Sequence, residues 1–249
     1  MKLLVILLCL FSERFLVHTI SFQRFNWFSE YYQRIKGNAD KNNFFTNPWA
    51  LLALIVLPLI AITAFVYLLM HGLFYGFMGL LFSIIIFFYC LGPQNVFYPV
   101  AQSVTKDTNQ LVGDYFFMVN RQLFSVVFWY IVAGPIAVVT YRLITLCRDI
   151  NLVSFQANEM TDLLEWIPAR LTALLYLVVG NFQRGVKLFC SSFVAKPDFN
   201  QEMLRECGLQ ALRANDADEV ALPAAESLVE HAIIVMLAFI AMFTLISWL

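Results

Sequence analysis

Long uncharged stretches separated by short polar ones dominate the pattern of this chain. Between Lys41 and Lys106 lie 64 residues without one Asp, Glu, Lys or Arg, and His71-Gly72 divides them into two apolar runs. As a helix, each run reaches roughly 30 Å at about 1.5 Å per residue, which matches the hydrocarbon core of a bilayer. The pattern therefore predicts a helical hairpin that crosses a membrane and returns.

Further apolar runs precede and follow this hairpin. Expected membrane runs are residues 3–11, 49–70, 73–91, 123–146, 171–189 and 231–249, and expected polar helical segments are 94–121 and 196–228. The first run resembles a signal peptide, but no small-residue cleavage site follows it, so we expect a retained short helix. The predicted fold class is all-α. We expect a single integral membrane domain over residues 1–249, built as a multi-pass helical bundle with short helices and two candidates for re-entrant segments.

Two of these runs have alternatives that the sequence leaves open. Residues 122–141 are uncharged and long enough to cross, but Gly134-Pro135 falls in the middle and removes a backbone donor, which favours a pair of half-helices. Residues 171–183 reach only about 20 Å as a helix, so this run either dips in or extends while the cations after it snorkel. If both runs are re-entrant, residues 147–165 face the cytoplasm. If both cross, the same residues are periplasmic.

Composition supports a membrane protein and narrows its partners. Hydrophobic residues make up 61% of the chain and charged residues 13%, with a mean hydropathy of +0.73, so the lipid bilayer is the expected surrounding. The net charge is −1 and the Lys and Arg residues are dispersed, which argues against a nucleic-acid partner. The five cysteines form no CxxC pair and four lie in or beside apolar runs, which predicts small core residues rather than disulfides. Basic residues within 12–48 place that segment and 94–121 in the cytoplasm by the positive-inside rule.

No motif for catalysis, a metal or a cofactor stands out. There is no glycine-rich string ahead of Lys-Ser or Lys-Thr that would cradle phosphates. His18, His71 and His231 lie far apart in apolar settings, which favours structural roles over a metal site. Ser191-Ser192 lacks an adjacent base. We therefore expect no catalytic residue, no metal and no cofactor, and look for function among the charged residues at the ends of apolar runs.

Arg170 stands where an acidic and aromatic segment meets an apolar run. A guanidinium keeps its charge beside hydrocarbon, so it needs a carboxylate, a backbone carbonyl, water or an anionic ligand. Asp162, Trp166 and Arg170 follow at four-residue steps and would share one helix face, with Pro168 between them as a kink. Snorkelling to the interface and binding of a ligand are both consistent with this pattern.

Four stretches together resemble one family. The most specific are FWYIVAGPIAVVTYRL at 128–143 and DLLEWIPARLTALL at 162–175, and SERF at 12–15 and LGPQN at 91–95 keep the same order and spacing. They look like AmpE, an inner-membrane protein of Gram-negative bacteria that is linked with a cytoplasmic cell-wall amidase to ampicillin-resistance signalling and β-lactamase induction. The resemblance implies a regulatory or sensory protein of the bacterial inner membrane, with that amidase or another signalling protein as partner.

AmpE in turn is similar to the adenosylcobinamide-phosphate synthases CobD and CbiB. Where the synthase has a string resembling ENTSDG, this chain has FMVNRQ at 117–122. A second string, resembling YRAxNTLDSM, keeps Tyr141 and Arg142, while its Asn, Thr and Asp are replaced by Thr145, Leu146 and Arg148. Because carboxylates that would hold a metal or activate a group are lost, the resemblance implies no cobinamide synthase activity. The alternative is a membrane-bound synthase with an altered substrate.

The retained charged motifs define a candidate binding site. Its residues, expected around one polar cytoplasmic mouth, are Arg121, Tyr141, Arg142, Asp162, Glu165 and Arg170. The arginines would bind an anionic ligand or acidic residues of a partner, held by the two carboxylates. The alternative is a set of internal salt bridges that pin broken helices. A small transporter is disfavoured because the chain shows no inverted repeat.

Overall fold

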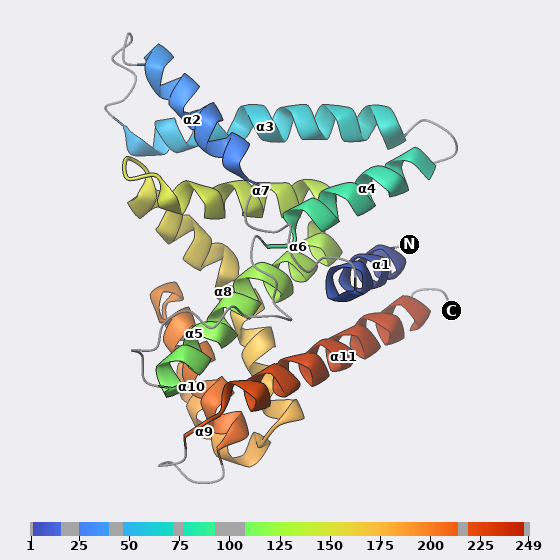
Figure 1. Cartoon of the computed structure of the whole chain (residues 1–249), viewed down its shortest axis with the longest axis vertical. Coiled ribbons are helices and arrows are strands. Elements are labelled where there is room, and N and C mark those ends of the chain that lie inside the picture. The colour runs from blue at the N-terminus through green and yellow to red at the C-terminus, as the bar shows by residue number, and fades with distance from the viewer. Residues whose placement is uncertain are drawn as a thin grey trace. The chain divides into compact units, whose positions relative to one another are not determined.

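The computed structural model describes residues 2–15, 25–39, 47–71, 77–92, 108–213 and 219–246. Every regular element in these ranges is a helix, which confirms the all-α prediction (Figure 1). Several features of the sequence lie outside the described residues: His18, the end of LGPQN and residues 94–107 of the expected polar segment 94–121.

The chain divides into two compact units. Unit 1 is made of Met1–Asn95 and Val126–Leu164, and unit 2 of Val96–Ser125 and Glu165–Leu249. Each unit therefore draws on two separate parts of the sequence.

Unit 1 is built around a buried apolar cluster. Its helices are α1 (Lys2–Phe15), α2 (Asn26–Ala39), α3 (Pro48–His71), α4 (Phe77–Cys90), most of α6 (Ser125–Ala133), α7 (Pro135–Leu146), the 3₁₀ turn η5 (Cys147–Asp149) and the start of α8 (Ser154–Val179). α3 and α4 pack side by side, α7 packs against both, and α1 packs against α4 (Figure 1). Phe28 of α2, Ile55 of α3 and Ile144 of α7 meet in the cluster. Burial of these apolar stripes holds α2 over α3 and α7.

The chain reverses between α6 and α7 at Gly134 (Figure 1). Gly134 has φ 80° and ψ −164°, a conformation that is essentially restricted to glycine. Pro135 then occupies the first turn of α7, where its missing N–H costs nothing. The helix thus breaks where the Gly-Pro pair predicts. Whether the two halves dip into a membrane or cross it stays a prediction.

Proline acts differently inside α3 and α8. Pro58 and Pro168 lie within these helices, and both helices continue through them. Pro168 is buried, together with Ala169 and Arg170 that follow it.

Unit 2 is organised around α10. Its helices are α5 (Thr108–Val119), the π turn η4 (Asn120–Phe124), the end of α8, α9 (Phe182–Ser192), the 3₁₀ turn η6 (Pro197–Phe199), α10 (Asn200–Leu212) and α11 (Leu222–Ile246). α10 packs against α5, α9 and α11. Gly208 makes the contact with α5 possible, because a Cβ there would lie 2.3 Å from the ring of Phe116. Phe116 in turn packs on Tyr176 of α8, with ring centroids 4.9 Å apart.

Within the described residues, three helices are long and apolar enough to cross a membrane, so this is a membrane protein. They are Pro48–Met70, Thr108–Ala133 and Leu222–Ile246. The second of these helices is the most enclosed by protein. It begins at Thr108, within the polar segment expected at 94–121 and before the membrane run expected at 123–146. The polar residues in its first turns alternate with buried apolar ones and do not interrupt the helix. The apolar run expected at 171–189 is divided by a break at Gly180-Asn181 between α8 and α9. The membrane boundaries themselves stay predictions.

The cysteines largely follow the prediction. All five are free, and Cys9, Cys90, Cys147 and Cys207 are buried. Cys190 differs, because it lies on an exposed side of α9.

Candidate functional site

The most unusual backbone feature of unit 2 is the π turn at Asn120–Phe124. The N–H of Ser125 bonds to the carbonyl of Asn120, five residues earlier, and the wider turn lies inside a helix of membrane-spanning length. Single π turns within α-helices occur often at functional sites. This turn carries the polar run Asn120-Arg121-Gln122 into an otherwise apolar helix.

Arg121 on the π turn forms an ion pair with Glu165 of α8. Arg121 Nε lies 2.9 Å from Glu165 Oε1, the Glu165 side chain is fully buried and that of Arg121 is 22% exposed. The guanidinium also lies over the Phe117 ring, 4.4 Å from its centroid. A carboxylate buried this completely requires its cation, because an uncompensated buried charge is strongly destabilising.

Uncharged polar groups extend this site. The Thr172 hydroxyl donates to Asn120 Oδ1 at 2.8 Å, and both side chains are buried. Asn120 Nδ2, Gln122 Oε1 and Ser125 Oγ have no hydrogen-bond partner among the described residues. Buried polar atoms normally find partners, so these donors and acceptors are free to bind a ligand or water. The polar centre of unit 2 is hereafter Asn120, Arg121, Gln122, Ser125, Glu165 and Thr172.

Arg170 is almost entirely occupied by main-chain acceptors. Its Nε donates to Phe193 O at 2.9 Å and its Nη2 to Ala195 O at 2.9 Å. Nη1 donates to Trp166 O at 2.8 Å and to Asn200 Oδ1 at 2.7 Å. The guanidinium also stacks on the Trp166 ring at 4.2 Å, as the shared helix face predicts. These contacts favour a pinning role over ligand binding for Arg170, because they join α8 to the connection between α9 and α10.

Burial acts on the charge of Arg170. The side chain is 4% exposed, and this desolvation lowers the pKa of the guanidinium. The ordinary pKa of an arginine side chain lies so far above neutral pH that the guanidinium stays charged even when burial lowers this pKa. Its charge is stabilised by carbonyl dipoles rather than by a carboxylate.

Arg142 has a related role in unit 1. Its Nε and Nη2 donate to the Cys90 carbonyl at 2.8 and 2.6 Å. Cys90 is the last residue of α4, where carbonyls lack partners in the helix and the helix dipole is negative. Arg142 therefore caps α4. Its neighbour Tyr141 is buried in the same unit.

The six predicted site residues divide between the units. Tyr141, Arg142 and Asp162 belong to unit 1, and Arg121, Glu165 and Arg170 to unit 2. Of these, the structure pairs Arg121 with Glu165. One polar mouth that gathers all six stays a prediction.

Two replaced motif positions have local structural roles. The Thr145 hydroxyl donates to the Arg142 carbonyl at 2.7 Å. Arg148 Nε donates to Asn158 Oδ1. Thr145 therefore bonds within α7, and Arg148 joins η5 to the start of α8, so neither position offers a carboxylate.

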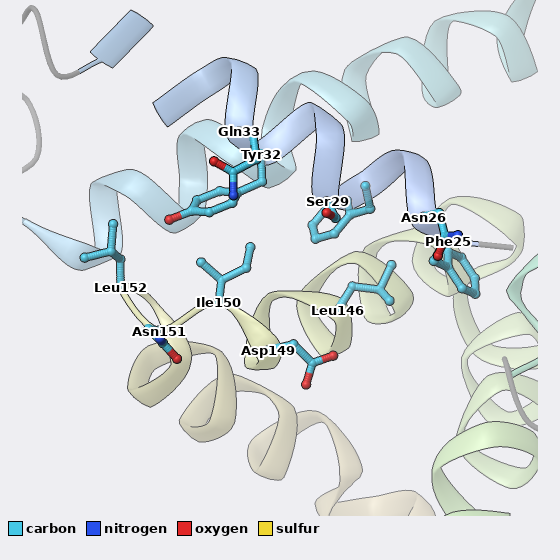
Figure 2. A pocket seen from close by; sticks show the side chains of 11 residues that line it. Phe25, Asn26, Ser29, Tyr32, Gln33, Leu146, Asp149, Ile150, Asn151 and Leu152 are labelled. Atoms are coloured by element: carbon cyan, nitrogen blue, oxygen red, sulfur yellow. The ribbon is translucent and has the colours of Figure 1, made fainter. Parts of the chain in front are cut away.

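A pocket of about 720 Å³ opens in unit 1 between α2 and the α7–α8 connection. In Figure 2, Leu146 and Ile150 point toward α2, while the polar ends of Asp149 and Asn151 turn away from it. The volume suits a small molecule, for which pockets span roughly 300–1,000 Å³. Its described lining contains the carboxylate of Asp149 and neither Lys nor Arg, which disfavours an anionic ligand here.

Comparison with known proteins supplies the family. A family model described as the regulatory signalling modulator protein AmpE matches residues 98–249. The chain belongs to the AmpE family. AmpE-type membership and the spanning helices indicate a regulatory membrane protein.

The chain also shows sequence similarity to a cobalamin biosynthesis protein. The chain is 36% identical over 73 residues to the cobalamin biosynthesis protein CobD of Stutzerimonas stutzeri (strain A1501), a match that covers 26% of this AmpE-family chain and 24% of CobD. It thus spans about a quarter of the length of that curated relative. No solved structure matches.

Sequence reasoning missed most of the polar centre. Asn120, Gln122, Ser125 and Thr172 were not among the expected site residues of this AmpE-family protein. The available signal was the run Asn120-Arg121-Gln122, three polar residues between apolar turns. The pocket beneath α2 left no such signal, because its lining combines residues 25–33 and 146–152 that only tertiary packing brings together.

Proposed function

We propose that this protein is a multi-pass regulatory protein of the bacterial inner membrane that acts in ampicillin-resistance signalling and β-lactamase induction. The family match over residues 98–249 supports this role. The loss of the synthase carboxylates at 117–122 and at Arg148, and of its Asn at Thr145, also supports a role in regulation rather than in synthesis. A cytoplasmic cell-wall amidase or another signalling protein is the proposed partner.

The Arg121–Glu165 pair on the π turn carries the proposal for the site. In a membrane segment, an ionisable pair is a default candidate for function. Arg121 is the more exposed of the arginines in the candidate site, since Arg142 and Arg170 are each 4% exposed. Arg121 is therefore the proposed contact for an anionic ligand or an acidic partner residue.

The other candidate residues have supporting parts in this proposal. Glu165 orients Arg121, and the neighbouring amides and hydroxyl of the polar centre add hydrogen bonds to the ligand. Arg142 caps α4 in unit 1, and Arg170 holds α8 in unit 2. Tyr141 and Asp162 stay proposed members of the site. The proposal thus combines both alternatives for the charged motifs, with binding at Arg121 and pinning at Arg142 and Arg170.

Replacement of Arg121 in cells tests the role. In a strain whose own gene carries Arg121→Ala, we expect β-lactamase induction by a β-lactam to be lost, and to fall by more than any decrease in the amount of protein in the membrane. Arg205→Ala is the matched control, because Arg205 forms an ion pair with Asp114 in the same unit at 2.7 Å and is 21% exposed. Induction that persists in Arg121→Ala, or that falls only in proportion to membrane abundance, would refute the proposed site.

The match to CobD favours a second candidate, a membrane-bound synthase with an altered substrate. This function requires that the purified protein bind a nucleotide or a corrinoid. Calorimetric titration of each compound into the reconstituted protein tests the synthase, and the absence of heat with both would refute it.

A further inference from the structure

Helix α9 follows a sharp break in the chain and is fixed on one side by its neighbours in unit 2. The N–H of Asn181, at the break, donates to the Ala211 carbonyl at 2.9 Å. A Cβ at Gly185 would lie 2.1 Å from Cδ2 of Leu177, so this glycine lets α9 lie directly against α8. These contacts define the side of α9 that faces the protein.

Apolar side chains form a stripe beside that protein-facing side. They follow at i, i+4, i+7 and i+11, which places them on one helix face: Phe182, Val186, Phe189 and Phe193. The two end members, Phe182 and Phe193, are 45% and 46% exposed, and the next residue, Val194, is 84% exposed. The described part of the chain therefore covers this stripe only partly.

The opposite side of α9 is polar and cationic. Gln183, Lys187 and Ser191 are exposed there. Lys196, in the turn after α9, is exposed as well. Neither lysine takes part in an ion pair among the described residues. These two ammonium groups are thus available to anionic groups outside the chain.

We propose that α9 lies in the plane of a membrane surface, with the Phe182–Phe193 stripe in the boundary between acyl chains and headgroups and Lys187 and Lys196 at anionic headgroups. Phenylalanine on one side and cations on the other, with little overall hydrophobicity, are typical of interfacial helices. The 11 residues of α9 reach about 17 Å, too short to cross roughly 30 Å of hydrocarbon. This inference does not depend on the proposed signalling role.

The bilayer is a better occupant of the stripe than a protein partner. Helices of this same chain are long and apolar enough to span a membrane, and α11 of unit 2 is one of them. Lipid is therefore present around unit 2 whenever the protein is in its membrane. The exposed lysines also complement anionic lipid, which attracts cations near the surface.

Spin labels along α9 test this in the full chain. Cys190 is the exposed one of the five cysteines, so Cys190→Ser provides a background for single cysteines at 182, 183, 186, 187, 189, 191 and 193. The protein is reconstituted into vesicles of phosphatidylethanolamine and phosphatidylglycerol. Relaxation of each label by oxygen, which partitions into lipid, is compared with relaxation by a water-soluble nickel chelate.

We expect oxygen and nickel accessibility to vary in opposite phase with a period of about 3.6 residues. Oxygen should have its maxima at 182, 186, 189 and 193, and nickel at 183, 187 and 191. High nickel accessibility along the stripe would overturn the proposal, because the stripe would then face water. Low accessibility to both reagents there would also overturn it, in favour of a protein partner or a second copy of the chain.

A second measurement leaves the stripe intact, in case its variants do not fold. A label on the native Cys190 lies between the stripe and the polar side. Combining Lys187→Glu with Lys196→Glu should raise its nickel accessibility in vesicles that contain phosphatidylglycerol, and not in vesicles of phosphatidylcholine alone. An unchanged value in both lipids would refute the contact between these lysines and anionic headgroups.

Discussion

Arg121 and Glu165 lie 44 residues apart in the sequence, and their side chains meet at 2.9 Å. The pair joins the π turn at Asn120–Phe124 to α8 and neutralises a carboxylate that is fully buried. Both residues belong to the predicted site, and the structure shows the ion pair between them directly. Its energetics can therefore be tested separately from signalling.

Removal of one partner should destabilise the protein more than removal of both. Breaking a buried pair costs about 3–5 kcal/mol, and the partial exposure of Arg121 places Glu165→Ala near the lower end. Arg121→Leu combined with Glu165→Leu removes both charges and should cost less than the sum of the single variants. Thermal unfolding of the detergent-solubilised proteins measures the cycle. Strictly additive effects would show that the two side chains are not coupled.

Arg170→Lys should be strongly destabilising although it keeps the charge. A single ammonium group cannot reach acceptors on Phe193, Ala195, Trp166 and Asn200 together, so buried acceptors lose their partner at about 1–3 kcal/mol each. We expect a clear fall in melting temperature. Arg34→Lys on the exposed side of α2 is the control and should melt like the parent. Equal melting temperatures for both variants would mean that the carbonyl contacts contribute nothing.

Gly134→Ala should destabilise the turn between α6 and α7 through the backbone alone. No heavy atom lies within 4 Å of the added Cβ, so a steric clash is not involved. The φ of 80° with ψ of −164° is unfavourable for any residue with a Cβ, at a cost on the order of 1–3 kcal/mol. Val132→Ala, at a side chain that is 57% exposed, serves as the nearby control in the same melting experiment. A variant as stable as the parent would indicate a different backbone at this position.

Thiol reactivity should be confined to Cys190 in the folded protein. Burial raises the pKa of the Cys147 and Cys207 thiols from 9.0 to about 12, so both lack the reactive thiolate near neutral pH as well as access. Mass spectrometry after brief treatment with a maleimide should show one modification, at Cys190. Full modification of all five should require a denaturant. Rapid labelling of Cys147 in the folded protein would contradict its burial.

The same raised pKa values give a pH dependence of stability. Below pH 9 the two thiols are protonated in the folded and the unfolded chain, and their contribution is fully present. As pH rises from about 9 toward 12, the unfolded chain loses these protons first and is favoured. The melting temperature should therefore fall over this alkaline range. Cys147→Ala with Cys207→Ala should reduce the alkaline dependence, and an identical dependence would assign it to other groups.

The pattern of apolar and polar residues is enough to predict an all-α membrane protein. In hydrocarbon a chain has to satisfy its backbone polar groups within each segment, so long uncharged runs leave helices as the main solution. The helix break at Gly134-Pro135 could also be predicted from the sequence, because it depends on the local chemistry of two adjacent residues. The order and spacing of the 128–143 and 162–175 motifs were enough to indicate the family.

The contacts of the charged residues, in contrast, depend on how the helices pack. Arg142 donates to the Cys90 carbonyl, which lies 52 residues away in the sequence, and Arg170 donates to acceptors up to 30 residues away in the sequence. Main-chain carbonyls at helix ends are present throughout any helical chain, so no residue type marks which of them an arginine will meet. The partner of Asn120 is likewise Thr172, 52 positions later. Such contacts depend on which helix ends packing places opposite each other, and that is a property of the assembled helices rather than of the local sequence.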